Sequence, residues 1–346
     1  MTSTETSPRD RGWAARMGQR DDWLAPAREA ALEPEREIVD PHHHLWNRGG
    51  ARYEMDDLAR DLEGHRVVQS VFIECRQWWR PEGEGPDHLR PVGETAAVAG
   101  RAAAHEGDPA LAAIVAHADL RSPHLDEILD AHVEAGRGLF RGIRHSAASD
   151  PSDALAIPGR EGPGLYRDEA FLRGLVRLGE RGFTFDAWHY HHQMEEFRAA
   201  AAAAPRTTIV LDHFGCPLGV GPHAGRREEI FARWKDDLAA AAELANVHAK
   251  LGGLAMIDNG WAFHERDRPP GSEELAALHG PWYRWTLERF GAGRCMFESN
   301  FPVDRASAPY GVFWNAFKRM TSDLPAADRA MLFAGTARRV YSLPEV

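Results

Sequence analysis

The chain is poor in cysteine: its 346 residues include only three, which are Cys75, Cys216 and Cys295. Three cysteines are too few for a disulfide framework, and each of them lies in or beside an apolar run. We therefore expect small buried side chains in a protein of a reducing compartment, the cytoplasm.

Long apolar runs are missing as well. No stretch of about 18 apolar residues occurs, so the sequence predicts no transmembrane helix. The first residues, MTSTETSPRDRGW, contain no apolar core, so they predict no signal peptide. We expect no membrane partner.

Positive charge is scarce relative to negative charge. The chain has 41 lysines and arginines against 52 aspartates and glutamates, a formal net charge of −11. Binding to nucleic acid needs a basic surface, so this balance argues against a nucleic-acid partner. A few buried arginines could still bind an anionic small molecule.

What the sequence does contain is a regular alternation of two patterns. Short apolar or β-branched runs, which predict buried strands, alternate with longer stretches of helical period. The eight predicted strands cover residues 36–42, 67–75, 112–120, 138–145, 182–189, 207–213, 246–253 and 294–300. The helices are expected near 55–64, 93–106, 122–135, 168–180, 193–204, 226–244, 272–290, 311–321 and 325–341.

Eight strand–helix units predict an α/β fold, a (β/α)8 TIM barrel formed by residues 36–346 as a single domain. A doubly wound sheet is the rival, but no Gly-rich phosphate loop follows the first strand. Residues 1–35 are expected to be an N-terminal arm, partly disordered, with Trp23 and Leu24 as anchors on the barrel.

Histidines gather at the predicted strand ends, where barrel enzymes carry their active sites. In Asp40-Pro41-His42-His43-His44, alternate residues of an extended chain share a face, so His42 and His44 point the same way and His43 points opposite. Two such imidazoles can bind one divalent cation. Ordinary core or surface histidines are the alternative.

The sixth strand ends in IVLDHFG, where His213 would be a third ligand or a catalytic group, or else a core histidine bonded to backbone. By alternation, Asp212 is expected to face the other way. The eighth strand supplies Glu298 and, on the following loop, Asp304; either carboxylate could take a proton from an attacking water.

Two cationic side chains are predicted to be buried near these strand ends, and a buried cation needs an anionic or carbonyl partner. Arg144 could hold a substrate carboxylate and assist catalysis, or form an ion pair with Glu74 or Glu298. Lys250 could bind the substrate in the same way or polarise its carbonyl group.

Aromatic and imidazole side chains on the loops after the strands predict a pocket for a ring-shaped small molecule. Trp78 follows the second strand. His189 and His191 share one face of the segment after the fifth strand, and both are candidates for substrate binding.

Four motifs, IVDPHHHLW, GIRH, IVLDHFGCP and MFESNFPVD, occur in this order along residues 21–342. Together they resemble the amidohydrolase superfamily, in the branch of amidohydrolase-2 proteins and TIM-barrel metal-dependent hydrolases. This branch includes lactonases that act on sugar lactones, pyrone dicarboxylates and sulfomuconolactones. More distant members are metal-dependent decarboxylases of aromatic acids.

The resemblance implies roles for individual residues. His42, His44 and His213 match the metal-binding histidines, and Arg144 matches an arginine that can hold a substrate carboxylate. The family's final aspartate is replaced by Asn300, which cannot act as a base but could contact the substrate. The resemblance therefore implies one divalent ion, Zn²⁺ or alternatively Mn²⁺, while metal-free operation remains open because some lactonases of this branch need no metal.

Three functions remain open from the sequence. The first is a hydrolase that opens a lactone or similar cyclic ester of a carboxylated small molecule with a metal- or carboxylate-activated water. The second is a metal-dependent non-oxidative decarboxylase of an aromatic or unsaturated acid. The third is a non-catalytic binding protein on a barrel scaffold. A homodimer is the oligomeric state that we consider.

Overall fold

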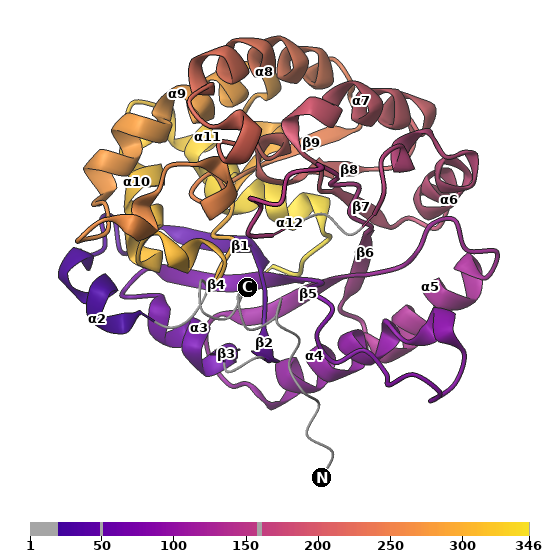
Figure 1. Ribbon diagram of the computed structural model, residues 1–346. Coiled ribbons are helices and arrows are strands. Elements are labelled where there is room, and N and C mark those ends of the chain that lie inside the picture. Colours follow the sequence, from indigo (N-terminus) through magenta and orange to yellow (C-terminus); the bar gives the residue numbers. More distant parts are fainter. Residues whose placement is uncertain (1–19, 49–50, 158–160, 346) are drawn as a thin grey trace.

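The computed structural model describes residues 20–48, 51–157 and 161–345. Eight parallel strands form one sheet in the order β1, β4, β5, β6, β7, β8, β9 and β10, and helices surround it (Figure 1). The strands are β1 (Glu37–His43), β4 (Arg66–Ile73), β5 (Ala110–Ala116), β6 (Phe140–Arg144), β7 (Thr184–Ala187), β8 (Ile209–Leu211), β9 (Val247–Leu251) and β10 (Cys295–Phe297).

A helix follows each strand unit. These helices are α3 (Met55–Asp61), α4 (Val92–Ala104), α5 (Leu125–Ala135), α6 (Glu169–Glu180), α7 (Met194–Ala203), α8 (Arg227–Ala242), α9 (Ser272–Phe290) and α10 (Tyr310–Met320). The end of the chain forms α11 (Ala326–Ala330), the π-turn η11 (Met331–Gly335) and α12 (Thr336–Val340). The predicted (β/α)8 barrel is confirmed.

The sheet nearly closes into a cylinder through the segment after β10. His43 forms a parallel bridge with Phe301, and the backbone N–H of His44 donates to the carbonyl of Phe301 at 2.7 Å. The buried carboxylate of Asp40 accepts from the backbone N–H and the hydroxyl of Ser299 at 3.0 and 2.6 Å. These bonds join the first strand to the last.

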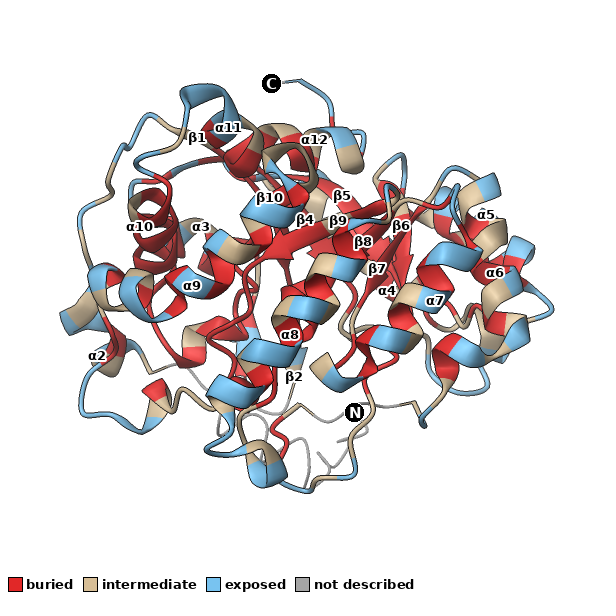
Figure 2. Cartoon of the chain, turned by 90° about the horizontal axis from the view of Figure 1, so that it is seen from above, coloured by how far each residue is buried: buried red, intermediate tan, exposed pale blue. Residues whose placement is uncertain are grey.

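Alternation along the strands divides the apolar core into two layers. One cluster, which includes Val71, Val115 and Val210, packs with Tyr341 and other residues of the C-terminal segment. Their neighbours in sequence, such as Phe72 and Ile114, pack in the larger cluster with the helices. Figure 2 shows the buried strands at the centre and helices with one buried and one exposed face.

The N-terminal arm contacts the barrel through its described residues, which begin at Arg20. Helix α2 (Asp21–Leu24) buries Leu24, and the Trp23 indole donates to the carbonyl of Arg266 at 2.9 Å. The Nζ of Lys318 on α10 donates to the carbonyl of Leu32 at 2.5 Å. The expectation of disorder falls on residues 1–19, which lie outside the described residues.

One element was not expected. The strands β2 (Trp46–Arg48) and β3 (Ala51–Tyr53) form an antiparallel pair directly after β1. A Gly-Gly pair between two short apolar-polar runs is a hairpin signal that the sequence carries at positions 49–50. The pair packs Trp46 and Tyr53 into the core.

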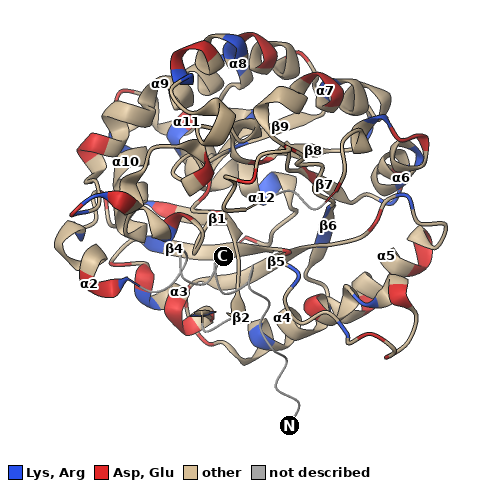
Figure 3. Cartoon of the chain, viewed as in Figure 1, with Lys and Arg blue, Asp and Glu red and all other residues tan. Residues whose placement is uncertain are grey.

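The outer helices carry charges of both signs, as Figure 3 shows for α5 and α8. Arg177 and Arg181 of the α6 region pair with Asp126 of α5, at 2.9 and 3.0 Å. Within the described ranges, no helix combines the length and the apolar character needed to cross a membrane.

Candidate active site

The two alternate histidines of the first strand meet at the carboxyl end of the barrel. The Nε2 atoms of His42 and His44 lie 3.3 Å apart, and both rings are buried. His43 points the other way and packs edge-on against Phe72 at 6.2 Å between ring centroids. The predicted shared face of His42 and His44 is confirmed.

The other nitrogen of each ring is held by an acceptor. His44 Nδ1 donates to the carbonyl of Ile73 at 2.8 Å, and His42 Nδ1 lies 2.7 Å from the carboxylate of Glu298. Neither acceptor can donate, so in both rings the proton sits on Nδ1 and the lone pair on Nε2. Burial lowers the pKa of both histidines well below its usual value, which keeps them neutral.

Glu298 joins the first strand to the loop after β8. Its second oxygen accepts from His213 Nδ1 at 2.7 Å. Burial alone would raise the pKa of Glu298, but the His213 and His42 rings hold it at about 2. Although burial opposes protonation of His213, Glu298 raises the pKa of this ring. Glu298 is thus an ionised carboxylate that orients two imidazoles.

Two glycines make room for this arrangement. A Cβ on Gly252 would lie 2.3 Å from Cγ of Glu298, and a Cβ on Gly253 would lie 2.3 Å from Nδ1 of His213. The pair directly follows β9 in the sequence KLGG. Side chains at these positions would displace the carboxylate and the ring, so the close approach requires glycine.

Asp212 lies inside the site, so the expectation that it faces away was wrong. His213 and Phe214 adopt left-handed backbone conformations, with φ of 52° and 60°, directly after β8 ends at Leu211. The chain therefore turns before strand alternation can apply. One ligand atom each from His42, Asp212 and His213 lies within 4.8 Å of the others.

A buried charge network lies beneath the histidines. Lys250 Nζ donates to Asp186 at 2.5 Å and lies 3.3 Å from both Asp212 and His42 Nδ1. The Tyr341 hydroxyl donates to Asp186 at 2.7 Å. Burial favours the neutral acid, but Lys250 and neighbouring cations hold the pKa of Asp212 below its usual value. Lys250 is thus already neutralised by two carboxylates.

Arg144 is also paired within the protein. Its Nε donates to Glu74 at 2.9 Å, as anticipated in the alternative interpretation, and its Nη1 lies 3.4 Å from His42 Nε2 and 3.6 Å from Asp212. Burial would lower the pKa of the Arg144 guanidinium, but the nearby carboxylate of Glu74 outweighs burial and raises it. Trp188 lies over Arg144 at 5.6 Å.

Asp304 follows β10 at the same mouth and is buried. Asn300, with φ of 54°, directs its amide toward Asp304 and donates to it at 3.2 Å. Burial is the main cause that raises the pKa of Asp304 to about 8, and Glu298 adds to it. This carboxyl can bind and release a proton near neutral pH.

His189 and His191, which were expected to bind the substrate, contact other groups of the protein. Both ring nitrogens of His189 have protein partners, the Tyr166 hydroxyl at 3.2 Å and the Met194 sulfur at 3.1 Å. His191 accepts from the backbone N–H of Leu218 at 3.2 Å. The 3-10 turn His191–Gln193 ends the alternation that placed these two rings on one face.

Trp78 is half-buried and stacks on a helix side chain rather than on the histidines. The guanidinium of Arg101 on α4 lies 3.7 Å from its ring centroid. The aromatic ring that faces the buried Arg144 guanidinium is that of Trp188, which was not among the residues predicted for the site. Asp186 and Asp212 were likewise not selected as site residues, although they lie next to the carboxyl ends of the observed strands β7 and β8, where site residues are expected.

The donor set fits a single divalent ion. Two nitrogens that bind one tetrahedral zinc ion at about 2.0–2.1 Å lie about 3.3 Å apart. That is the observed separation of the Nε2 atoms of His42 and His44. Their lone pairs face each other, which is unfavourable unless a cation or a donor lies between them. Carboxylate and carbonyl partners on Nδ1 are the usual second layer of a histidine metal site.

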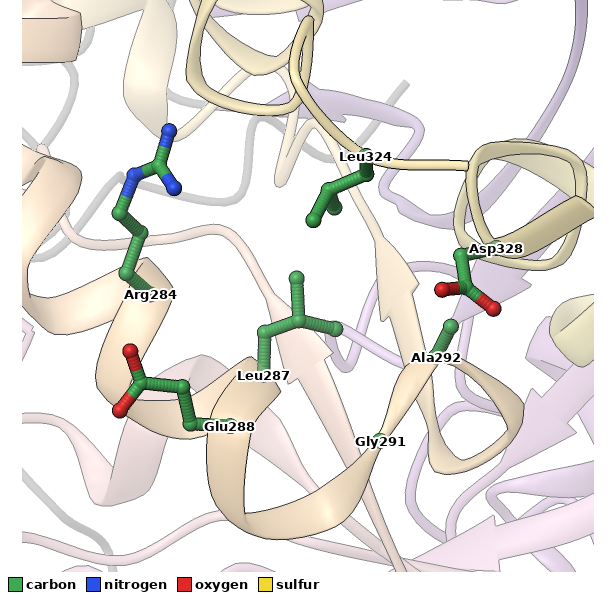
Figure 4. A pocket seen from close by; sticks show the side chains of 7 residues that line it. All are labelled: Arg284, Leu287, Glu288, Gly291, Ala292, Leu324 and Asp328. Atoms are coloured by element: carbon green, nitrogen blue, oxygen red, sulfur yellow. The ribbon is translucent and has the colours of Figure 1, made fainter. Parts of the chain in front are cut away.

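A surface hollow of about 270 Å³ lies elsewhere, beside the start of β10 (Figure 4). Gly291 and Ala292 precede that strand, so the hollow lies toward the amino ends of the strands, away from the histidines. It is lined by Arg284, Leu287, Glu288, Gly291, Ala292, Leu324 and Asp328.

Comparison with known proteins gives consistent results. The family model described as Amidohydrolase matches residues 39–343. The chain is 30% identical over 326 residues to the uncharacterized protein y4mH of Sinorhizobium fredii, covering 88% of this chain and 98% of that protein. It is 29% identical over 319 residues to an L-fucono-1,5-lactonase of Burkholderia multivorans, covering 89% and 96%.

Solved structures of the same fold include two crystal structures of an amidohydrolase from Burkholderia multivorans, one with bound HEPES and one with bound zinc. Each has a TM-score of 0.70 and 26% identity, and the match covers 89% of this chain and 100% of that chain. The likeness therefore extends over the whole barrel.

Proposed function

We propose, from the premise that the chain belongs to the amidohydrolase family, that this hydrolase opens a lactone or a similar cyclic ester. The observation that carries the proposal is the pair of neutral imidazoles of His42 and His44, with facing Nε2 atoms 3.3 Å apart. The similarity to an L-fucono-1,5-lactonase supports this substrate class.

His42, His44 and His213 would hold one divalent ion, with Zn²⁺ as the first choice because a similar amidohydrolase was crystallised with zinc. When bound, such an ion supplies Lewis acidity for a carbonyl oxygen or a water. Glu298 keeps the His42 and His213 rings in place and offsets the added positive charge.

Asp304 is the group that we assign to proton transfer. A water oxygen adds to the lactone carbonyl carbon, Asp304 in its ionised form, which predominates above about pH 8, accepts the proton of that water, and the ring C–O bond breaks. The proton then passes to the ring oxygen, which becomes the hydroxyl of a hydroxy acid. Asn300 aligns the Asp304 carboxyl for this step. Glu298 is assigned to positioning, because its Oε1 bonds to His213 Nδ1 and its Oε2 lies 2.7 Å from His42 Nδ1.

If the substrate carries a carboxylate, Arg76 is better placed to bind it than Arg144. Arg144 and Lys250 are already neutralised by Glu74 and by two aspartates. Arg76 follows β4, is half-buried, and stacks over Trp79 at 5.2 Å. Its charge helps to lower the pKa of Glu74, which places the guanidinium near the carboxylate that pairs with Arg144.

The test is hydrolysis by the zinc-replete protein of a panel of sugar lactones and carboxylated lactones, followed by proton release and product analysis. Ring opening of at least one member supports the proposal. If no member is opened and carbon dioxide is released from an aromatic acid instead, the protein is a decarboxylase. If R76M no longer hydrolyses a carboxylated lactone but still hydrolyses neutral lactones, the result would support the assignment of Arg76.

A further inference from the structure

A second group of metal-ligating side chains lies on loops that follow three neighbouring strands. Asp150 follows β6, His192 follows β7 and His223 follows β8. His223 Nε2 lies 2.9 Å from Asp150 Oδ2, and His192 Nε2 lies 3.8 Å from the same oxygen. One ligand atom of each side chain lies within 4.8 Å of the others. None of them belongs to the site around His42.

We propose that Asp150, His192 and His223 bind a second divalent transition-metal ion, Zn²⁺ in the first place, at the rim of the barrel mouth. Two imidazoles and one carboxylate are donors that zinc accepts, and they leave a coordination position open to water. Ligand atoms around one zinc ion lie about 3 to 3.5 Å apart. Binding would therefore have to bring His192 Nε2 closer to Asp150 Oδ2 than the observed 3.8 Å.

The cluster is partly ordered before any ion arrives. The Asp150 side chain is 4% exposed and that of His223 is 14% exposed, whereas His192 is 34% exposed and faces water. The rings of His192 and His223 are parallel within 5°. Burial opposes ionisation of Asp150, but His223 and the backbone N–H of Ser152 hold its pKa below its usual value. The carboxylate form that a metal needs is therefore present.

Binding of an ion would replace existing contacts of His223 and His192. The ion displaces the proton that His223 shares with Asp150, and it replaces the contact of His192 Nε2 with the carbonyl of Ser149 at 3.1 Å. Metal binding should therefore release a proton and weaken at low pH. A bound ion would join the three loops that follow β6, β7 and β8, and Arg144, Asp186 and Asp212 lie at or next to the ends of these strands.

A third cluster offers a matched control. His88, His124 and Glu127 also bring their ligand atoms together, but the side chains of His124 and Glu127 are 55% and 53% exposed. Mobile side chains lose more conformational entropy on binding an ion. We therefore expect this cluster to bind zinc more weakly than Asp150, His192 and His223.

The experiment uses the double variant H42A/H44A, which removes the central histidine pair. Zn²⁺ and Co²⁺ binding is measured by calorimetry and by elemental analysis after dialysis. We expect one ion per chain, with at least tenfold weaker binding after the further change D150N or H223N, and unchanged binding after H124N. Equal binding in all of these variants, or loss in H124N alone, would overturn the proposal.

If H42A/H44A fails to fold, the same comparison is made in the otherwise unchanged protein. D150N and H223N should each bind one ion fewer per chain than the parent, and H124N should bind as many as the parent. Because the readout is ion binding rather than activity, failure of this site and failure of lactone hydrolysis are distinguishable.

Discussion

His42 and His44 face each other through unprotonated Nε2 atoms 3.3 Å apart, because Glu298 and the carbonyl of Ile73 hold the protons on the opposite nitrogens. Two lone pairs at this separation repel each other unless a cation or a hydrogen-bond donor lies between them. The Nη1 of Arg144, 3.4 Å from His42, supplies part of this positive charge. A bound ion would supply more.

The first prediction concerns metal content. H42A and H44A should each contain one zinc ion fewer per chain than the parent after expression with zinc, because each removes one of two converging donors. Elemental analysis of the purified proteins measures this. H124N, at an exposed imidazole of the outer surface, should retain the parent content. Unchanged zinc in both H42A and H44A would contradict a centre at these histidines.

The second prediction separates positioning from ligation. E298Q keeps the shape of the side chain but removes the charge that orients His42 and His213, so zinc affinity should fall about 10- to 100-fold. Competition with a chromogenic chelator measures the change. E94Q is the matched control, because burial and Glu74 raise the pKa of Glu94 to about 8 and leave it protonated at pH 7. Equal affinities in the two variants would refute the role of Glu298.

The third prediction concerns proton transfer. D304N should lower kcat on a lactone substrate by about 10²- to 10⁴-fold, because an amide cannot accept the proton of the attacking water. Zinc content should stay at the parent value, since Asn300 rather than the histidines holds this side chain. Steady-state kinetics with elemental analysis measure both. A D304N enzyme with parental kcat would assign the proton acceptor to another residue.

The fourth prediction concerns stability. K250M should lower the free energy of unfolding by about 3–5 kcal/mol, because Asp186 and Asp212 would be left buried without their shared cation. Denaturant unfolding followed by circular dichroism measures it. The loss in K250M/D186N should be smaller than the sum of the two single losses, since the second change removes one of the uncompensated charges. Strict additivity would show that Lys250 and Asp186 do not interact.

The fifth prediction is a pH dependence with a defined sign. His132 Nε2 donates to the carbonyl of His117 at 3.0 Å, and its Nδ1 accepts from the Thr95 hydroxyl at 2.8 Å. Burial lowers the pKa of this ring from 6.5 to about 4. The unfolded chain therefore takes up this proton first as the pH falls. Stability should be lost between pH 6.5 and about 4, by about 3 kcal/mol from this residue.

Unfolding curves across that pH interval check the fifth prediction. The slope of stability against pH should be smaller in H132Q than in the parent protein. A parental slope in H132Q would show that His132 does not contribute.

Local patterns in the sequence were enough to predict the barrel. Strand and helix periods, together with turn residues, placed all eight strands within a few residues, because these signals depend on neighbours in the chain. Alternation also predicted that His42 and His44 share a face, since β1 continues through His43. The hairpin β2–β3 was missed although Gly49-Gly50 marks it in the sequence.

The partners of the buried charges could be decided only by the tertiary structure. Arg144 pairs with Glu74, 70 positions away, and Tyr341 reaches Asp186 from the end of the chain. The left-handed turn at His213 brings Asp212 into the site against strand alternation. Periodicity tells which face a side chain occupies while the strand lasts. Which charges meet depends on how the sheet closes and where each strand ends.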